Sequence, residues 1–121
     1  MDIDNLNCCQ RAAFDVCERL GIEADEKIIS VISPLGDGFG IGGICGAAMG
    51  AVLGAGIALD GQLGEDVRLA VVMRFMKDFK SISCGSLVGQ YGQNGCEKIV
   101  DSAVEEAVLA VKNIKKGGFD I

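Results

Sequence analysis

The sequence predicts an all-α protein, a compact single-domain bundle of five to six helices around a glycine-rich central helix. Helical periodicity dominates the chain, with apolar residues recurring on one face of successive segments. The length of 121 residues corresponds to one domain. Half of the residues are hydrophobic, which is enough to bury a core. We therefore expect residues 1–121 to form one helical domain.

The first predicted helix covers residues 6–20, and Gly21 follows it as a C-terminal stop signal. Its apolar residues share one stripe at positions i, i+4, i+7, i+8 and i+11. They are Cys9, Ala13, Val16, Cys17 and Leu20. A second, shorter helix is predicted over residues 25–33 and ends at Pro34, because the residue before a proline disfavours the helical conformation.

A glycine loop over residues 36–43 leads into a third predicted helix at about residues 44–59. Small residues recur on it every four positions: Gly46, Gly50 and Gly54, beside Ala47, Ala51 and Ala55. A ridge without side chains allows another backbone to approach closely. Because glycine has a low helix propensity, neighbouring elements must hold this helix. We place it at the centre of the bundle, and the same ridge could serve a homodimer interface.

Two further helices complete the predicted bundle. The fourth, near residues 64–79, is expected to bury one apolar stripe: Leu69, Val72, Met73, Met76 and Phe79. A turn-rich passage over residues 83–95 follows. The last helix, at about residues 96–116, has the core stripe Ile99 or Val100, Ala103, Ala107, Val111 and Ile114. Gly117 and Gly118 end it.

Composition excludes most kinds of functional chemistry. With 17 acidic against 11 basic residues and a net charge of −6, the chain lacks the basic face of a nucleic-acid binder. Histidine is absent, which excludes a Ser-His-Asp triad, a Cys-His nucleophile pair and imidazole metal ligands. The acidic pairs of the sequence are expected on exposed helix faces. The six cysteines are therefore the main source of candidate chemistry.

The expected compartment is the cytoplasm. The first five residues are acidic and lack the basic, apolar pattern of a signal peptide. Residues 38–59 carry no charge, but they are rich in glycine and alanine and have neither an aromatic belt nor a basic flank. We interpret them as a buried loop and helix and expect no membrane insertion. In a reducing cytoplasm, cysteines act more often as ligands or redox groups than as disulfides.

Four of the six cysteines fall in first turns: Cys8, Cys45 and Cys96 at the starts of predicted helices, and Cys84 after Ser83, a good N-cap in the turn-rich passage. The free amides and the positive dipole at a helix N-terminus favour thiolate, the form that binds soft metals and iron–sulfur clusters or attacks disulfides. If these helix starts converge, they make an all-sulfur site that needs no histidine. We interpret Cys17 and Cys9 as core residues that fill space. The absence of a Cys-x-x-Cys pair favours a shared centre over a local dithiol.

The chain also carries the elements of a known family: Asn7-Cys8 with Gln10, Gly43-Ile44-Cys45-Gly46-Ala47-Ala48-Met49-Gly50, Ser83-Cys84 and Cys96. Over roughly residues 6–100 they resemble the C_GCAxxG_C_C family, whose members are described as redox-active proteins with four characteristic cysteines. The label usually has GCAxxG at its centre, where this chain has Cys-Gly-Ala-Ala-Met-Gly. The resemblance implies redox or metal-binding roles for Cys8, Cys45, Cys84 and Cys96. It implies a close-packing role beside the site for Gly46, Ala47 and Gly50.

A nucleotide-binding alternative depends on the glycine loop. Residues 38–43 fit G-x-G-x-x-G, residues 28–32 could form the preceding strand, and Asp60 lies near the position of a ribose-binding acid. The stretch Pro34-Leu35-Gly36-Asp37 separates the supposed strand from the first glycine, and no second strand–helix–strand unit follows. We expect no nucleotide cofactor.

The leading hypothesis is a redox protein, with electron transfer favoured over a substrate-specific enzyme. Its four cysteines would hold a metal ion or an iron–sulfur centre, or would exchange electrons as dithiols with a redox partner protein. The alternative is a non-enzymatic metal-binding or structural module whose all-sulfur site stabilises the fold. A third hypothesis, an enzyme with a small organic substrate, lacks an acid–base partner for a nucleophilic cysteine.

Overall fold

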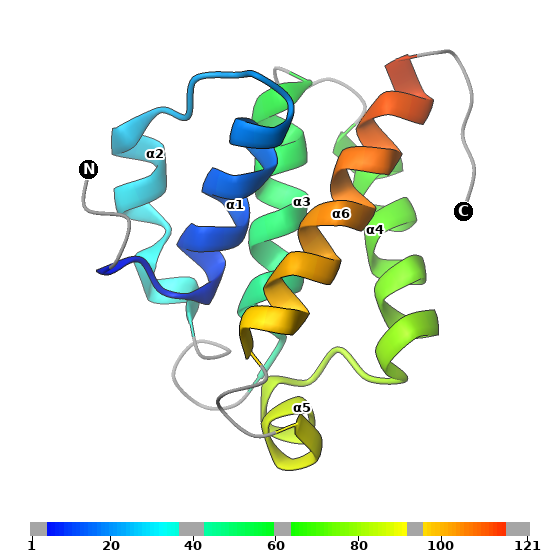
Figure 1. The fold of residues 1–121 in the computed structure, drawn as a ribbon. Helices are drawn as coiled ribbons and strands as arrows, with labels where there is room; N and C mark the ends of the chain where they lie inside the picture. The colour runs from blue at the N-terminus through cyan, green and yellow to red at the C-terminus, as the bar shows by residue number, and fades with distance from the viewer. Residues whose placement is uncertain (1–4, 37–42, 60–63, 92–95, 116–121) are drawn as a thin grey trace.

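The computed structural model describes residues 5–36, 43–59, 64–91 and 96–115, and most of these are helical (Figure 1). The α-helices are α1 (Cys8–Arg19), α2 (Glu26–Val31), α3 (Gly46–Ala58), α4 (Gly64–Phe79), α5 (Cys84–Tyr91) and α6 (Cys96–Lys115), with a 3₁₀ turn, Ser33–Leu35, after α2. No strand occurs within these ranges, where the one β-interaction is an isolated antiparallel bridge between Ile44 and Ser83. The all-α prediction is confirmed.

Local sequence signals define both ends of α1. Asn7 is the N-cap, its side chain accepts a hydrogen bond from the Gln10 amide, and Gln10 Oε1 accepts one from the Asn7 amide. At the other end, Gly21 has a φ of 70°, and the amide of Ile22 donates to the carbonyl of Cys17 at 2.9 Å. This left-handed glycine closes a Schellman motif, as the stop signal predicted.

The Asn7 side chain also joins α1 to the 3₁₀ turn, because its amide nitrogen donates to the Ser33 carbonyl at 2.7 Å. We expect Asn7→Ala to lower the free energy of unfolding by about 1–2 kcal/mol, since both the cap and this link are lost. Asn7→Asp keeps the cap acceptor and loses only the donor, so it should cost less. Urea denaturation of the three proteins measures the difference, and equal losses in both variants would show that the cap contributes nothing.

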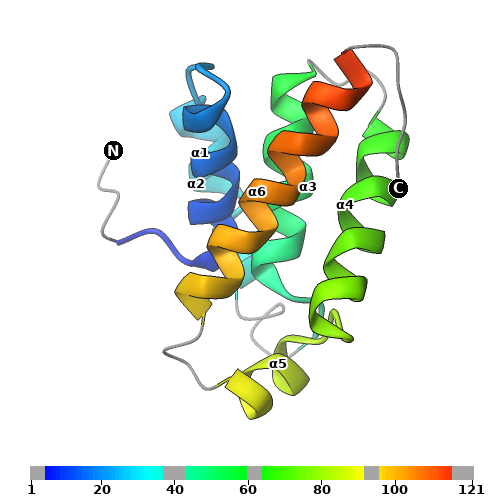
Figure 2. The ribbon, with the colours of Figure 1, turned by 45° about the vertical axis from the view of Figure 1, so that its right-hand side comes forward.

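Helices α1, α3 and α6 run in the same direction and begin at the same end of the bundle, whereas α4 runs the opposite way (Figures 1 and 2). Helix α3 packs against α1, α4 and α6, which makes it the central helix that the sequence predicted. Helix α2 lies against α1. The short helix α5 lies beyond the end of the bundle where α1, α3 and α6 begin, and it takes up residues 84–91 of the passage that the sequence predicted to be turn-rich.

The glycine ridge of α3 allows α1 to approach at backbone distance. A methyl group at Gly50 would collide with the carbonyl oxygen of Cys9 and lie 2.9 Å from the Ala12 side chain. One at Gly54 would lie 2.8 Å from the carbonyl oxygen of Ala13. The predicted close approach is therefore confirmed, and the partner is α1 of the same chain. Gly46, Gly50 and Gly54 are buried against α1, so this ridge is not available to a second copy.

The predicted core stripes of α1 and α6 are largely confirmed. Of the α1 stripe, Leu20 alone is partly exposed, and the α6 stripe is buried throughout. The stripe predicted for α4 is wrong at three positions: Leu69, Met73 and Met76 are 46%, 50% and 38% exposed. Ala70, Val71 and Phe75 are buried instead. Helix α4 is apolar on two faces, so helical spacing alone did not show which face contacts α3 and α6.

Two other expectations concern nucleotide binding near the glycine loop and insertion into a membrane. Residues 28–31, which the nucleotide-binding alternative needed as a strand, belong to α2. Residues 38–42, most of the G-x-G-x-x-G segment, and Asp60 lie outside the described residues. Among the described helices, none has both the length and the apolar character needed to span a membrane.

Candidate functional site

The fold brings together the starts of four helices that carry the candidate cysteines. Cys8, Cys84 and Cys96 are the first residues of α1, α5 and α6, and Cys45 immediately precedes α3. Helices α1, α3 and α6 begin at one end of the bundle, and α5 lies at that end (Figure 1). Parallel helices point their unsatisfied amides and positive dipole ends in the same direction. This end of the bundle is therefore suited to negatively charged sulfur.

Cys8 and Cys45 are brought into one cluster by the contact between α1 and α3. A methyl group at Gly46 would lie 2.5 Å from Sγ of Cys8, so the thiol rests on the backbone of the residue that follows Cys45. Both Cys8 and Cys45 act electrostatically on Cys9, which places the three sulfur atoms in one neighbourhood. Cys45 is buried, whereas Cys8 is half-buried.

Cys84 is tied to Cys45 through the backbone. The amide of Cys45 donates to the carbonyl of Ile82 at 2.6 Å, and Ile44 pairs with Ser83 in the isolated bridge. Ser83 precedes α5, and its hydroxyl accepts a hydrogen bond from the Ser86 amide at 3.4 Å. The segments that carry Cys45 and Cys84 are thus adjacent in space. The side chains of Cys84 and Cys96 lie outside the described part of the structure.

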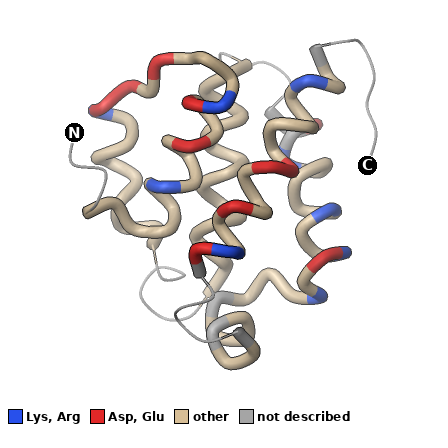
Figure 3. The backbone as a smooth tube through the Cα atoms, in the orientation of Figure 1, with Lys and Arg blue, Asp and Glu red and all other residues tan. Residues whose placement is uncertain are grey.

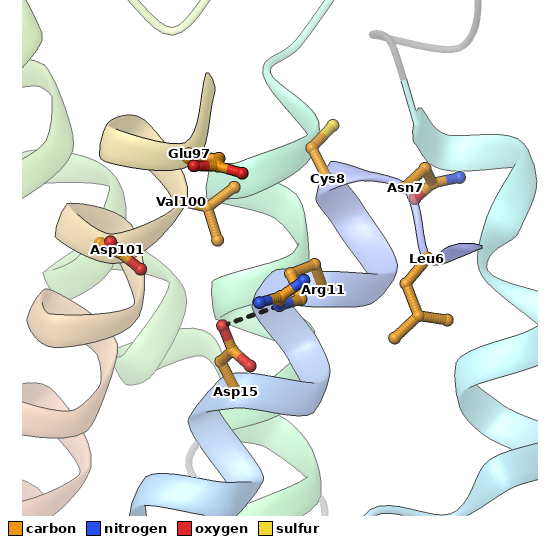
Figure 4. Close-up of a pocket in the computed structure, with 8 residues that line it drawn as sticks. All are labelled: Leu6, Asn7, Cys8, Arg11, Asp15, Glu97, Val100 and Asp101. Carbon is orange, nitrogen blue, oxygen red and sulfur yellow. Dashed lines mark hydrogen bonds and ion pairs between the residues drawn. The ribbon is translucent and has the colours of Figure 1, made fainter. Parts of the chain in front are cut away.

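A pocket of about 340 Å³ connects the Cys8 thiol with the surface between α1 and α6 (Figure 4). Its lining comes from the start of α1 and the first turns of α6: Leu6, Asn7, Cys8, Arg11, Asp15, Glu97, Val100 and Asp101. Arg11 Nε donates to Asp15 Oδ2 at 3.4 Å. Glu97 directly follows Cys96, so the same pocket brings the start of α6 beside Cys8. Of the candidate thiols whose side chains the structure describes, Cys8 is the one that lines this pocket and is partly exposed.

Acidic residues dominate the α6 side of this pocket. Glu97 and Asp101 are exposed, and so is Glu105, one turn further along α6. Figure 3 shows acidic residues on successive turns of this helix. Early acidic residues complement the positive end of the α6 dipole. The i, i+4 spacing of Arg11 and Asp15 was visible in the sequence, but nothing in the sequence showed that α1 and α6 are neighbours. Sequence reasoning therefore missed the pocket.

Burial separates Cys9 and Cys17 from the candidate set. The pKa of Cys9 is raised to about 12, first because its side chain is buried and then because Cys8 and Cys45 lie near it. Burial also raises the pKa of Cys17, whose Sγ lies 4.0 Å from the Gly54 carbonyl oxygen. Both side chains are fully buried. They stay neutral at physiological pH and fill the interface between α1 and α3.

The raised pKa of Cys9 predicts a loss of stability in alkali. In the unfolded chain the thiol loses its proton near its ordinary pKa of 9.0, but in the folded protein only near 12. The free energy of unfolding should therefore be unaffected below pH 9 and fall above it, by up to about 1.4 kcal/mol per pH unit. Urea denaturation under reducing conditions measures the free energy of unfolding at about pH 7.5 and about pH 10. Between these two pH values it should fall by about 1 kcal/mol less in Cys9→Ala than in the wild-type chain. The same drop in both proteins would contradict this effect of burial.

The donor chemistry of the candidate cysteines fits a soft metal or an iron–sulfur cluster, since thiolates are the preferred ligands of both. Among the described side chains, no group of three or more cysteine or acidic residues is arranged to hold a metal ion. Cys8 and Cys45 would supply two ligands, and a complete set requires Cys84 and Cys96 from the adjacent helix starts. A centre at this position would therefore need cysteines from all four helices.

One comparison with known proteins gives a match. The model of a family described as "Putative redox-active protein (C_GCAxxG_C_C)" matches residues 6–109, most of the chain. No curated protein and no solved structure matches this chain.

Proposed function

Because the chain belongs to the C_GCAxxG_C_C family, whose description is redox-active, we propose that Cys8, Cys45, Cys84 and Cys96 form one redox centre. The observation that carries this proposal is the contact of Cys8 Sγ with Gly46, next to Cys45, at the end of the bundle where all four helices begin. Helices distant in sequence meet at this one place. A set of scattered packing cysteines would not require that arrangement.

The geometry supports a centre shared by the four cysteines. Helices α1, α3 and α6 begin at the same end of the bundle, and the positive end of a helix dipole favours thiolate as a general rule. A redox-active metal ion or an iron–sulfur cluster, if bound there, would supply a group that accepts and returns one electron. The role of the chain is to hold the ligands and to exclude water from Cys45, which is buried. Gly46 and Gly50 permit the close approach that brings Cys8 to Cys45.

Electron exchange with a partner would take place at the Cys8 side of the centre. Cys8 is half-buried and opens onto the pocket between α1 and α6, whereas Cys45 is covered. A redox partner protein is therefore the expected reactant, and a reducing cytoplasm is the compartment we propose. The same residues allow a dithiol reaction, in which two thiols form a disulfide and release two electrons and two protons. In the described part, Cys8 and Cys45 are the candidates for that pair.

The second candidate function is a structural metal site, and the junction of four helix starts favours it. Metal bound there would fix α1, α3, α5 and α6 relative to one another and contribute directly to folding. A reductive titration of anaerobically purified protein, followed by absorption and circular dichroism, separates the two functions. A redox centre should show a reversible spectral change with helicity kept. A structural site should show no redox change, and a chelator should unfold the protein.

A further inference from the structure

We propose that Gln10 is a positioning residue for Cys8: together with Asn7 it anchors the first turn of α1 to α2 and the 3₁₀ turn, and so holds the Cys8 thiol against α3. The proposal rests on the redox role proposed above for Cys8. Within the described ranges, Gln10 is the one polar or charged residue that is buried, with 8% of its surface exposed. Burying a polar side chain is costly unless it is hydrogen-bonded, so the partners of Gln10 indicate its role.

The side chains of Asn7 and Gln10 each make two kinds of hydrogen bond. Their oxygen atoms close the capping box at the start of α1. Their nitrogen atoms bond outside α1: Gln10 Nε2 donates to the Ile29 carbonyl at 2.9 Å, and Asn7 Nδ2 donates to the Ser33 carbonyl at 2.7 Å. Ile29 belongs to the last turn of α2, where carbonyls have no partner within their own helix. The two amides therefore serve the start of α1 and the end of α2 together.

The residue types fit this double role. A capping box requires only acceptor oxygens from its side chains, and glutamate serves at the position of Gln10 as well as glutamine does. An ionised glutamate could not donate to the Ile29 carbonyl, because a carboxylate only accepts. The anchor is also closely packed, since a methyl group at Gly36 would lie 2.5 Å from Asn7 Nδ2. An amide at position 10 is thus explained by the bond to α2 rather than by the cap.

Cys8 lies between the two anchoring residues, directly after Asn7 and two residues before Gln10. Figure 4 shows the Asn7 amide nitrogen on the side of Asn7 remote from Cys8. The Cys8 thiol instead rests on α3, where a methyl group at Gly46 would lie 2.5 Å from Sγ. The first turn of α1 is therefore fixed to α2 by its amides and to α3 by its thiol. Without the Gln10 bonds, this turn should open more often and expose Cys8.

Alkylation of the reduced chain by iodoacetamide, with each modified cysteine identified by peptide mass spectrometry, tests the proposal. Gln10→Met keeps the length of the side chain and removes its hydrogen bonds. Cys8 should then react about fivefold faster or more, since the loss of one buried hydrogen bond shifts a local opening equilibrium by about this factor. Gln10→Glu keeps the acceptor oxygen but lacks the donor to Ile29, so it should also accelerate Cys8.

Two controls separate positioning from a general loss of stability. Cys17 is fully buried further along α1, so its alkylation rate reports opening of the whole helix and should rise less than that of Cys8. Asp25→Ala removes the cap of α2, where Asp25 accepts hydrogen bonds from the amides of Lys27 and Ile28, and leaves the anchors of α1 intact. It should leave the Cys8 rate unchanged. Circular dichroism verifies that each variant is helical.

The proposal would be overturned if Cys8 reacted at the wild-type rate in helical Gln10→Met or Gln10→Glu. Equal acceleration of Cys8 and Cys17 would also overturn it, because the substitution would then act through unfolding of α1. The readout is the reactivity of a thiol and needs no redox centre. A chain that binds no metal and shows no redox change would therefore contradict the proposed function and leave this test of Gln10 valid.

Discussion

Replacing Gly50 by alanine is expected to lower the free energy of unfolding by about 2–4 kcal/mol. The new methyl group would collide with the carbonyl oxygen of Cys9 and press on the Ala12 side chain. Because the obstructing atom belongs to the backbone of α1, it cannot turn aside as a flexible side chain does. Alanine favours the helical state by about 1 kcal/mol over glycine, which is too little to offset this collision. Urea denaturation measures the loss.

Gly56 provides the control in the same helix. A methyl group there meets no atom within 4 Å, so Gly56→Ala should raise the free energy of unfolding by about 0.5–1 kcal/mol. The two substitutions are chemically identical and differ only in what faces the new methyl group. Changes of the same sign would contradict the close packing of α3 on α1.

Replacing Cys45 by serine is expected to remove the centre with the fold retained. Cys45 lies between the Cys8 contact on Gly46 and the backbone bridge that leads to Cys84. Serine is nearly isosteric but is a much poorer ligand for soft metals, so bound metal should fall to background. The measurement is metal content per chain after anaerobic purification, with circular dichroism to verify helicity.

Cys17→Ser is the matched control, because Cys17 is a buried cysteine of α1 remote from the helix starts. It should keep the metal content of the wild-type chain. Cys8→Ser extends the test to the half-buried thiol and should behave like Cys45→Ser. Equal effects of Cys45→Ser and Cys17→Ser would refute the division of the cysteines into ligands and core residues.

Much of the helical structure was predictable from the sequence, for reasons seen in particular helices. Helices α1 and α6 have one dominant apolar face, so their spacing identified the buried side directly. Gly21 marked the end of α1, because its left-handed conformation favours glycine. Helix α4 failed this test because Leu69, Met73 and Met76 form a second apolar face that the fold leaves exposed. Local periodicity contains no information about which face a neighbour will cover.

The candidate site was predictable only in part. The sequence placed Cys8, Cys84 and Cys96 at helix starts, where the structure also has them, because capping and turn residues precede them. It could not show that α1, α3 and α6 run in the same direction, which is what gathers the helix starts at one end of the bundle. That direction depends on long connections and tertiary packing rather than on local signals. The pocket beside Cys8 depends on the same packing.

The most direct test of the shared centre is the metal and acid-labile sulfide content of protein purified without oxygen, together with its absorption spectrum. If the four cysteines share one centre, the protein should contain stoichiometric bound metal, with sulfide and broad visible bands when the centre is an iron–sulfur cluster. Metal-free protein in which all six cysteines titrate as thiols would contradict it.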